Sequence, residues 1–183
     1  MIKKILIAAI ALFLTNCSSI SELDAVWEKD NNQLFKTIGT REYTNLTKEQ
    51  AVNAMVVAFQ RLDLIIENSD FKTGLLSGTA NAPKPLTLEE YNLMAKTEDA
   101  RARMYFPLIY WSPSGYESKF NAVVLDIPNG VQISLRARLT LPGRPDLHIL
   151  SNFPPKGVEI AIKKIWNEFE KVEFIQRATL KKR

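Results

Sequence analysis

A regular alternation of apolar and polar residues over residues 131–141 constrains the fold of this chain more than any other feature. Its apolar positions are Val131, Ile133, Leu135, Ala137, Leu139 and Leu141. A period of two predicts a β-strand with one face in the core and the other in water. The turn sequence Pro128-Asn129-Gly130 predicts a hairpin with the preceding strand, Phe120–Ile127. The sequence therefore predicts an antiparallel sheet with a single apolar face.

Two amphipathic helices are predicted to cover that apolar face. The first begins at a capping box, where Thr47 and Gln50 have the spacing for reciprocal hydrogen bonds, and it extends to Arg61. The second follows Pro154 and Pro155 and covers Lys156–Val172. The predicted fold class is α+β, an antiparallel sheet with two main helices packed on one face, plus a helical and aromatic insertion.

Three further strands are predicted, at Leu34–Tyr43, Leu64–Glu67 and Leu75–Ala80. The turn formers Asn68-Ser69-Asp70 and Lys72-Thr73-Gly74 separate the last two strands, which we expect to be antiparallel neighbours. One group of large apolar side chains is expected to form the core: Phe59, Leu62, Ile66, Leu76, Ile133, Leu135, Trp166 and Phe169.

Residues 81–115 are predicted to form an insertion between sheet strands. Two prolines stop the sheet, and a second capping box, Thr87–Glu90, begins a charged helix over residues 88–104. The densest aromatic run of the chain follows this helix and contains Pro107, which is uncommon in core strands. We expect its aromatic residues to bind a partner protein. These residues are Tyr105, Phe106, Tyr110 and Trp111. The alternative is an edge strand that buries them in the core.

The N-terminus has the pattern of a secretory signal peptide. Lys3 and Lys4 form a basic region, and Ile5–Leu14 form an apolar run of ten residues. A membrane-spanning helix needs roughly 20 apolar residues, so this run is too short to be one.

The end of that segment, Leu14-Thr15-Asn16-Cys17, resembles the lipobox of bacterial lipoproteins. The resemblance implies cleavage before Cys17 and acyl chains such as palmitate on that residue. Asn16 departs from the pattern, which usually has Gly, Ala or Ser there. Ser18 stands where an Asp would favour retention in the inner membrane, so we expect the outer membrane and its periplasmic face. The alternative is an ordinary signal peptide with an incidental cysteine.

These patterns predict one folded domain behind a lipid anchor. The expected segments are a signal peptide (1–16), a lipidated tether (17–33), a single α+β domain (34–176) and a basic tail (177–183). Apolar residues at helical intervals within the tether include Leu23 and Trp27. Trp27 is expected either at the bilayer surface or packed on the domain.

Composition excludes several classes of function. Removal of Lys3 and Lys4 takes two positive charges from the net +4, and the remaining charge of about +2 argues against nucleic acid as a partner. Cys17 is the single cysteine and His148 the single histidine, so no zinc site and no nucleophile–histidine triad is predicted. Nucleotide-binding loops and EF-hand spacings are absent from the sequence, and we expect no cofactor and no metal.

Several segments resemble a family of uncharacterised proteobacterial envelope lipoproteins. The resemblance lies in residues 47–51, 64–70, 73–77 and 166–175, and it covers residues 34–80 and 116–176. The chain is also similar, more distantly, to the helix-grip-like domains of the C lipoprotein of the outer-membrane β-barrel assembly machinery. Both resemblances imply a small α+β domain tethered to a membrane, and neither brings catalytic residues.

The function expected from the sequence is that of a non-enzymatic, membrane-anchored lipoprotein of the bacterial envelope, which binds or assembles another protein. The alternative is a carrier or sensor of a small apolar ligand held between sheet and helix. A hydrolase with partners distant in sequence is a third hypothesis.

Overall fold

The computed structural model describes residues 21–105, 116–140 and 150–180. In these ranges, five strands form one antiparallel sheet in the order β1-β5-β4-β3-β2. The strands are β1 (Thr40–Thr44), β2 (Ile65–Asp70), β3 (Leu75–Asn81), β4 (Glu117–Ile127) and β5 (Gly130–Thr140). The labelled helices are α2 (Lys48–Arg61), α3 (Leu88–Tyr105) and α4 (Pro155–Leu180), and a helix over residues 21–37, here the N-terminal helix, precedes them.

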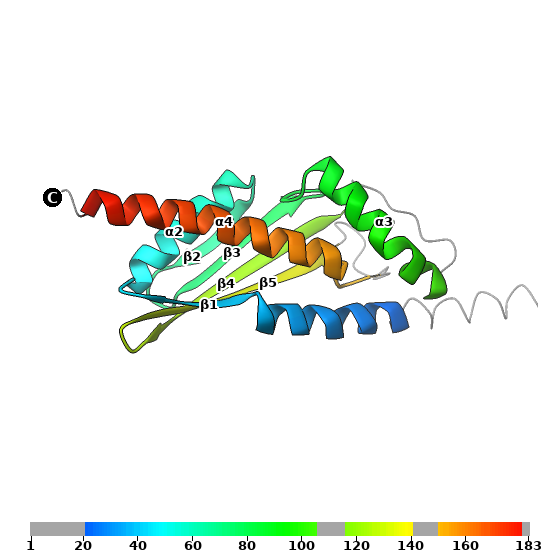
Figure 1. Cartoon of the computed structure of the whole chain (residues 1–183), viewed down its shortest axis with the longest axis horizontal. Coiled ribbons are helices and arrows are strands. Elements are labelled where there is room, and N and C mark those ends of the chain that lie inside the picture. Colours follow the sequence, from blue (N-terminus) through cyan, green and yellow to red (C-terminus); the bar gives the residue numbers. More distant parts are fainter. Residues whose placement is uncertain (1–20, 106–115, 141–149, 181–183) are drawn as a thin grey trace, which may run out of the picture.

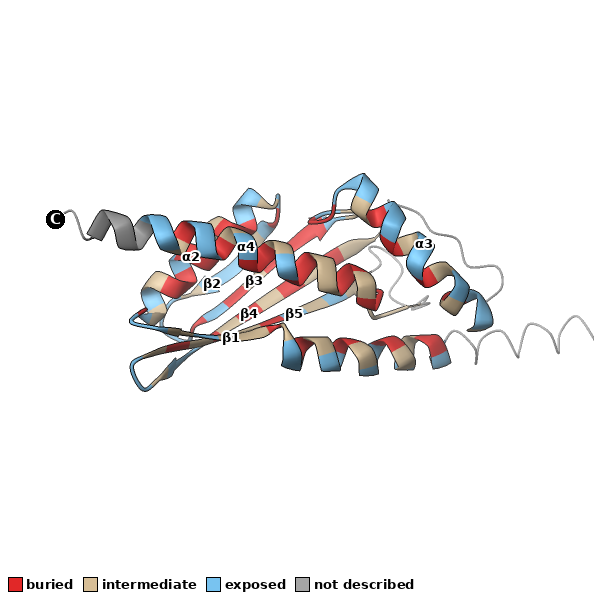
Figure 2. Cartoon of the chain, viewed as in Figure 1, coloured by how far each residue is buried: buried red, intermediate tan, exposed pale blue. Residues whose placement is uncertain are grey.

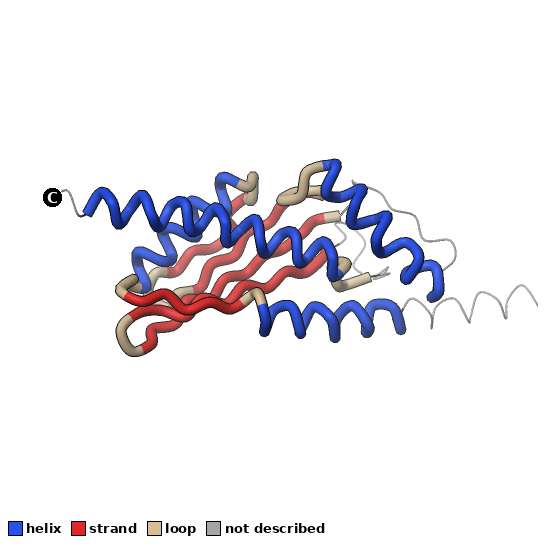
Figure 3. Tube along the Cα trace, viewed as in Figure 1, coloured by secondary structure: helices blue, strands red, loops and turns tan. Residues whose placement is uncertain are grey.

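Helices α2 and α4 contact each other and lie together on one face of the sheet (Figure 1). Figure 3 shows how helices and strands follow one another along the chain. The predicted α+β class, with an antiparallel sheet and two main helices on one of its faces, is confirmed. The expected positions of both β-hairpins are also confirmed, since β2 pairs with β3 and β4 pairs with β5.

The core lies between the sheet and these two helices (Figure 2). Phe59 of α2 and Trp166 and Phe169 of α4 are at most 1% exposed, and Ile133 and Leu135 on β5 are at most 2% exposed. Of the eight predicted core residues, Leu62 and Ile66 are only partly buried and pack at the margin of the core. Gly78 on β3 lets Phe59 approach closely, because a Cβ there would lie 2.9 Å from Phe59 Cδ2.

The capping box of α2 forms as expected from the sequence. The backbone N–H of Gln50 donates to Thr47 Oγ1 (3.2 Å), and the backbone N–H of Thr47 donates to Gln50 Oε1 (3.0 Å). The same pair of bonds at Thr87 and Glu90 begins α3. Both helix starts are therefore fixed by residues three positions apart.

The prediction of a strand over Leu34–Tyr43 is wrong for its first part. The N-terminal helix continues to residue 37, and the strand begins only at Thr40. Phe35 continues the helical spacing of Leu23 and Trp27, and all three side chains are buried. The helix ends two residues before Gly39, where a Cβ would lie 2.8 Å from the carbonyl oxygen of Phe35 and 3.0 Å from that of Leu135 on β5. Residues 21–33 of the predicted tether are therefore folded.

Two further boundaries differ from prediction. Residues Asn68–Asp70, predicted as a turn, belong to β2, and a bulge between Ile66 and Asn68 keeps them paired with β3. The Asp70 carboxylate accepts hydrogen bonds from the N–H groups of the next turn and thus ends the strand. Helix α4 extends past the predicted end at Val172 to Leu180, so part of the predicted tail is helical.

Helix α3 occupies the predicted insertion between β3 and β4, and it packs beside α4 rather than on the sheet (Figure 1). Within the described ranges, no helix has both the length and the apolar character needed to cross a bilayer.

Candidate functional site

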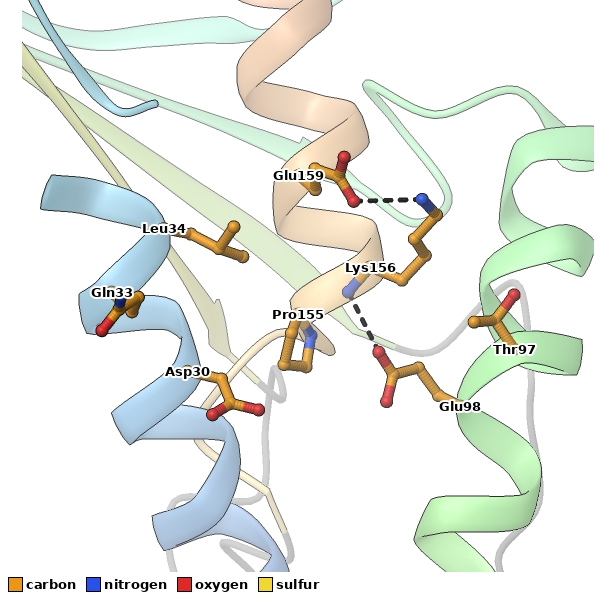
Figure 4. A pocket seen from close by; sticks show the side chains of 8 residues that line it. All are labelled: Asp30, Gln33, Leu34, Thr97, Glu98, Pro155, Lys156 and Glu159. Atoms are coloured by element: carbon orange, nitrogen blue, oxygen red, sulfur yellow. Dashed lines mark hydrogen bonds and ion pairs between the residues drawn. The ribbon is translucent and has the colours of Figure 1, made fainter. Parts of the chain in front are cut away.

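Three helices meet at one end of the domain, and we call this meeting point the three-helix junction. It consists of the N-terminal helix, α3 and the first turns of α4 (Figure 4). Gly157 in α4 makes the approach of α3 possible, because a Cβ there would lie 2.5 Å from Met94 Sδ and would collide with the ring of Phe153. A small residue at this position is thus required by the packing of α3 against α4.

Polar bonds fix the N-terminal helix to the segment that leads into α4. Asp24 Oδ1 accepts from the backbone N–H groups of Ser151 (2.8 Å) and Asn152 (2.9 Å). Asn31 is 1% exposed, and its Nδ2 donates to the carbonyl oxygen of Phe153 at 2.7 Å. These partners are backbone groups of residues 151–153 and cannot change position by a side-chain rotation. The bonds therefore hold the N-terminal helix at one position along its axis.

Helix α3 is joined to both neighbours by charged groups. The buried Glu98 accepts from the backbone N–H of Lys156 at 3.0 Å, at the N-terminus of α4 where a negative charge is favoured. Arg101 Nη2 lies 2.5 Å from Asp30 Oδ2 of the N-terminal helix. The junction therefore places one carboxylate of α3 and one of the N-terminal helix near each other, each already bound to a donor of the protein.

A second, smaller apolar cluster closes the junction at its outer end. Leu23 and Trp27 of the N-terminal helix are buried against Ala102 of α3, and Tyr105 and Leu150 pack around them. Of the two positions expected for Trp27, the structure shows packing on the domain, since its side chain is 0% exposed.

A surface hollow of about 360 Å³ lies between the three helices. Its lining residues are Asp30, Gln33 and Leu34 of the N-terminal helix, Thr97 and Glu98 of α3, and Pro155, Lys156 and Glu159 of α4 (Figure 4). A second hollow of about 410 Å³ lies along the N-terminal helix and is lined mainly by charged and amide side chains of that helix. The alternative function, a carrier or sensor of an apolar ligand, requires a cavity between the sheet and the helices that cover it. Neither of these two hollows lies there.

Two carboxylates have pKa values below their usual range: Glu159, which lines the hollow, and Glu90 in the first turn of α3. Hydrogen bonds from Lys163 and then Lys156 lower the pKa of Glu159 below its usual range. At Glu90, burial raises the pKa, but the bonds from Lys164 and from the N–H of Thr87 outweigh it, so the pKa is lowered. A carboxylate with a lowered pKa is a poor general acid at neutral pH, and these groups are accounted for by ion pairing.

The largest pKa increases occur at tyrosines. Burial raises the pKa of Tyr43 to about 12, and burial also raises the pKa values of Tyr91 and Tyr116. The Tyr43 ring packs on Phe169 with centroids 5.0 Å apart. These shifts follow from core packing and do not define a reactive group. Among the described residues, no group of three or more potential ligands could hold a metal ion.

Of the residues predicted to bind a partner, only Tyr105 is described, and it is half-buried in the small cluster with Leu23 and Trp27. Phe106, Tyr110 and Trp111 lie outside the described residues, as do Cys17 and His148. Sequence reasoning missed the exposed apolar side chains of α3 itself. Leu88 and Leu93 are each 55% exposed and Met104 is 82% exposed. The signal was present, since Leu93, Ala100 and Met104 have the spacing of one helix face.

Comparisons with known proteins leave the family of this chain open. Neither the protein-family models nor the curated proteins contain a match. A crystal structure of a DUF4468 family protein from Bacteroides ovatus is similar, with 16% sequence identity and a TM-score of 0.28. The similarity covers 56% of this chain and 54% of that chain, so about half of each molecule is involved. A likeness of this size carries no inference about function.

Proposed function

We propose that this chain is a lipoprotein of the bacterial envelope, held at the outer membrane by lipid on Cys17, with its domain in the periplasm. We further propose that the domain acts by binding another protein rather than by catalysis. The observation that carries the proposal is the position of Cys17, four residues before the first described helix. Cleavage before Cys17 removes the signal peptide and leaves the described fold complete.

The outer face of α3 supports protein binding as the mode of action. Its buried face contains Tyr91, Met94 and Glu98, whereas Leu88 and Leu93 are directed to solvent. We propose that Leu93 belongs to an interaction surface, since contiguous exposed apolar patches mark such surfaces. The aromatic residues Phe106, Tyr110 and Trp111 follow this helix and remain a prediction for the same surface.

The charged groups of the three-helix junction are consistent with a structural role. Glu98, Asp30 and Glu159 each bind a donor that ties one helix to another or stabilises a helix turn. Their present partners account for their positions without a substrate. This favours a binding domain over a hydrolase.

Replacement of Cys17 tests the anchor. In a Cys17→Ser variant of the full chain, the protein should leave the membrane fraction and appear in the soluble periplasmic fraction, because the acyl chains are lost. The matched control is Ser19→Ala, two residues away, which leaves the proposed acylation site intact. Membrane association that survives Cys17→Ser would place the anchor elsewhere.

Photo-crosslinking tests the binding surface. A photoreactive residue at Leu93 should yield a crosslinked product with one protein in living cells. The control position is Phe174, which is 71% exposed and lies ten residues beyond Lys164, the α4 residue that binds Glu90 of α3. Crosslinking of the same proteins from both positions, or none from Leu93, would argue against α3 as the binding surface.

A further inference from the structure

The chain between the proposed lipid and the folded domain is very short. Only residues 18–20 separate Cys17 from Ser21, where the description of the N-terminal helix begins. Four Cα-to-Cα steps span at most about 14 Å when fully extended. The start of the helix is therefore within about 14 Å of the residue that carries the lipid.

The N-terminal helix cannot act as a flexible extension of this tether, because it is part of the domain. Trp27 is fully buried, and Asn31 and Asp24 bind backbone groups near the start of α4. The ion pair of Asp30 with Arg101 adds a link to α3. A short tether on a helix held in this way restricts the whole domain.

The start of the N-terminal helix and the end of α3 lie at the same end of the molecule (Figure 1). The cluster of Leu23 with Ala102 and Tyr105 holds them side by side. We call this surface, residues 21–25 together with residues 101–105, the anchor end. The end of α4 and the β4–β5 turn lie at the opposite end (Figure 1).

The anchor end presents the most exposed of the large apolar side chains in the described ranges. Met104 is 82% exposed, on the last turn of α3. Its long, unbranched side chain suits an irregular apolar environment. Arg103 on the same turn is ion-paired with Asp99 (Nε to Oδ2, 2.8 Å), so the contact with lipid proposed below rests on Met104 and the short tether.

We propose that the anchor end rests on the phospholipid bilayer, with the Met104 side chain in the boundary between headgroups and acyl chains. This inference rests on the proposed lipidation of Cys17 and specifies what that anchor does. The lipid fixes an orientation: the anchor end faces the bilayer, and the β2–β3 and β4–β5 turns point away from it.

A single-thiol label tests this orientation. The sulfur of a lipidated Cys17 is a thioether, so a cysteine introduced at Met104 is the one free thiol of the full-length lipoprotein. Purified Met104→Cys protein is labelled with a polarity-sensitive fluorophore and reconstituted into vesicles of phosphatidylethanolamine and phosphatidylglycerol. A fraction of the lipids carries a nitroxide quencher on the headgroup. The matched control is Lys72→Cys in the turn between β2 and β3, which is also exposed.

The label at residue 104 should be quenched several-fold more strongly than the label at residue 72. Equal, weak quenching at both positions would show that the domain stands away from the bilayer and would overturn the proposal. Because the vesicles contain no other protein, quenching at residue 104 reports contact with lipid alone.

A second variant tests the role of the short tether. Insertion of about 20 Gly and Ser residues after Ser19 allows a separation of about 25 Å while leaving Cys17 in place. Quenching at residue 104 should then fall to the level seen at residue 72, and undiminished quenching would contradict the role given to the tether.

Flotation of the vesicles separates the two possible failures. Protein that does not float with the vesicles has no lipid anchor, which refutes the proposed function. Protein that floats but shows no quenching at residue 104 refutes only the orientation.

Discussion

Replacement of Trp27 by alanine should release the N-terminal helix from the domain. The side chain is fully buried in the small cluster with Leu23 and Ala102. A buried tryptophan removes about 150–250 Å² from water, and its truncation to alanine typically costs about 3–5 kcal/mol. Such a loss increases the fraction of molecules with an undocked N-terminal helix by a factor of about 100 or more.

Hydrogen exchange resolves this effect along the chain. Amides of residues 21–37 should exchange about a hundredfold faster in Trp27→Ala, while amides of β4 and β5 change less, because undocking of one helix is a local opening. Phe174→Ala is the control, since that ring is 71% exposed and its removal should change stability by no more than about 0.5 kcal/mol. Unchanged exchange over residues 21–37 in Trp27→Ala would refute the view that this residue docks the helix.

Three further changes test the packing and the electrostatics. Gly78→Ala should lower the free energy of unfolding by about 1–3 kcal/mol in urea titrations, because the new Cβ would lie 2.9 Å from Phe59 Cδ2, and an unchanged midpoint would contradict this packing. Thr47→Ala should cost about 1 kcal/mol by removing the cap of α2, whereas Thr47→Ser should restore most of it. Burial raises the pKa of Tyr43 from 10.0 to about 12. The shift therefore contributes to the free energy of unfolding in full below pH 10, and this contribution is lost as the pH rises toward about 12. Tyr43→Phe should therefore lose less stability than the wild type between these pH values in chemical denaturation, and identical pH profiles would exclude this contribution.

Local signals made much of the fold predictable from the sequence. The β4–β5 hairpin follows from a turn sequence and a period of two, and the start of α2 follows from Thr47 and Gln50, which are three residues apart. Each of these interactions is between near neighbours in the chain, so its geometry is already contained in the order of the residues.

The boundary between the N-terminal helix and β1 could not be derived in this way. Phe, Thr and Ile in residues 34–38 have the composition of a strand, but Phe35 is buried by tertiary contacts and Gly39 lies against the carbonyl oxygen of Leu135. Tertiary packing overrides local preference at such places.

The three-helix junction was likewise beyond sequence reasoning. Its bonds join residues such as Asp24 and Asn152, which are 128 positions apart, and Asn31 and Phe153, which are 122 apart. Nothing in the local sequence around Asp24 indicates a backbone N–H group as its partner. The exposure of Leu93 and Met104 likewise depends on where α3 is placed in the fold.

Mass spectrometry of the N-terminal peptide of the mature protein, isolated from its native envelope, tests the central claim most directly. The account predicts a peptide that begins at Cys17 and carries acyl chains, with residues 18–20 as the whole link to the folded domain. A mature chain that begins at another residue, or an unmodified Cys17, would contradict the lipid anchor.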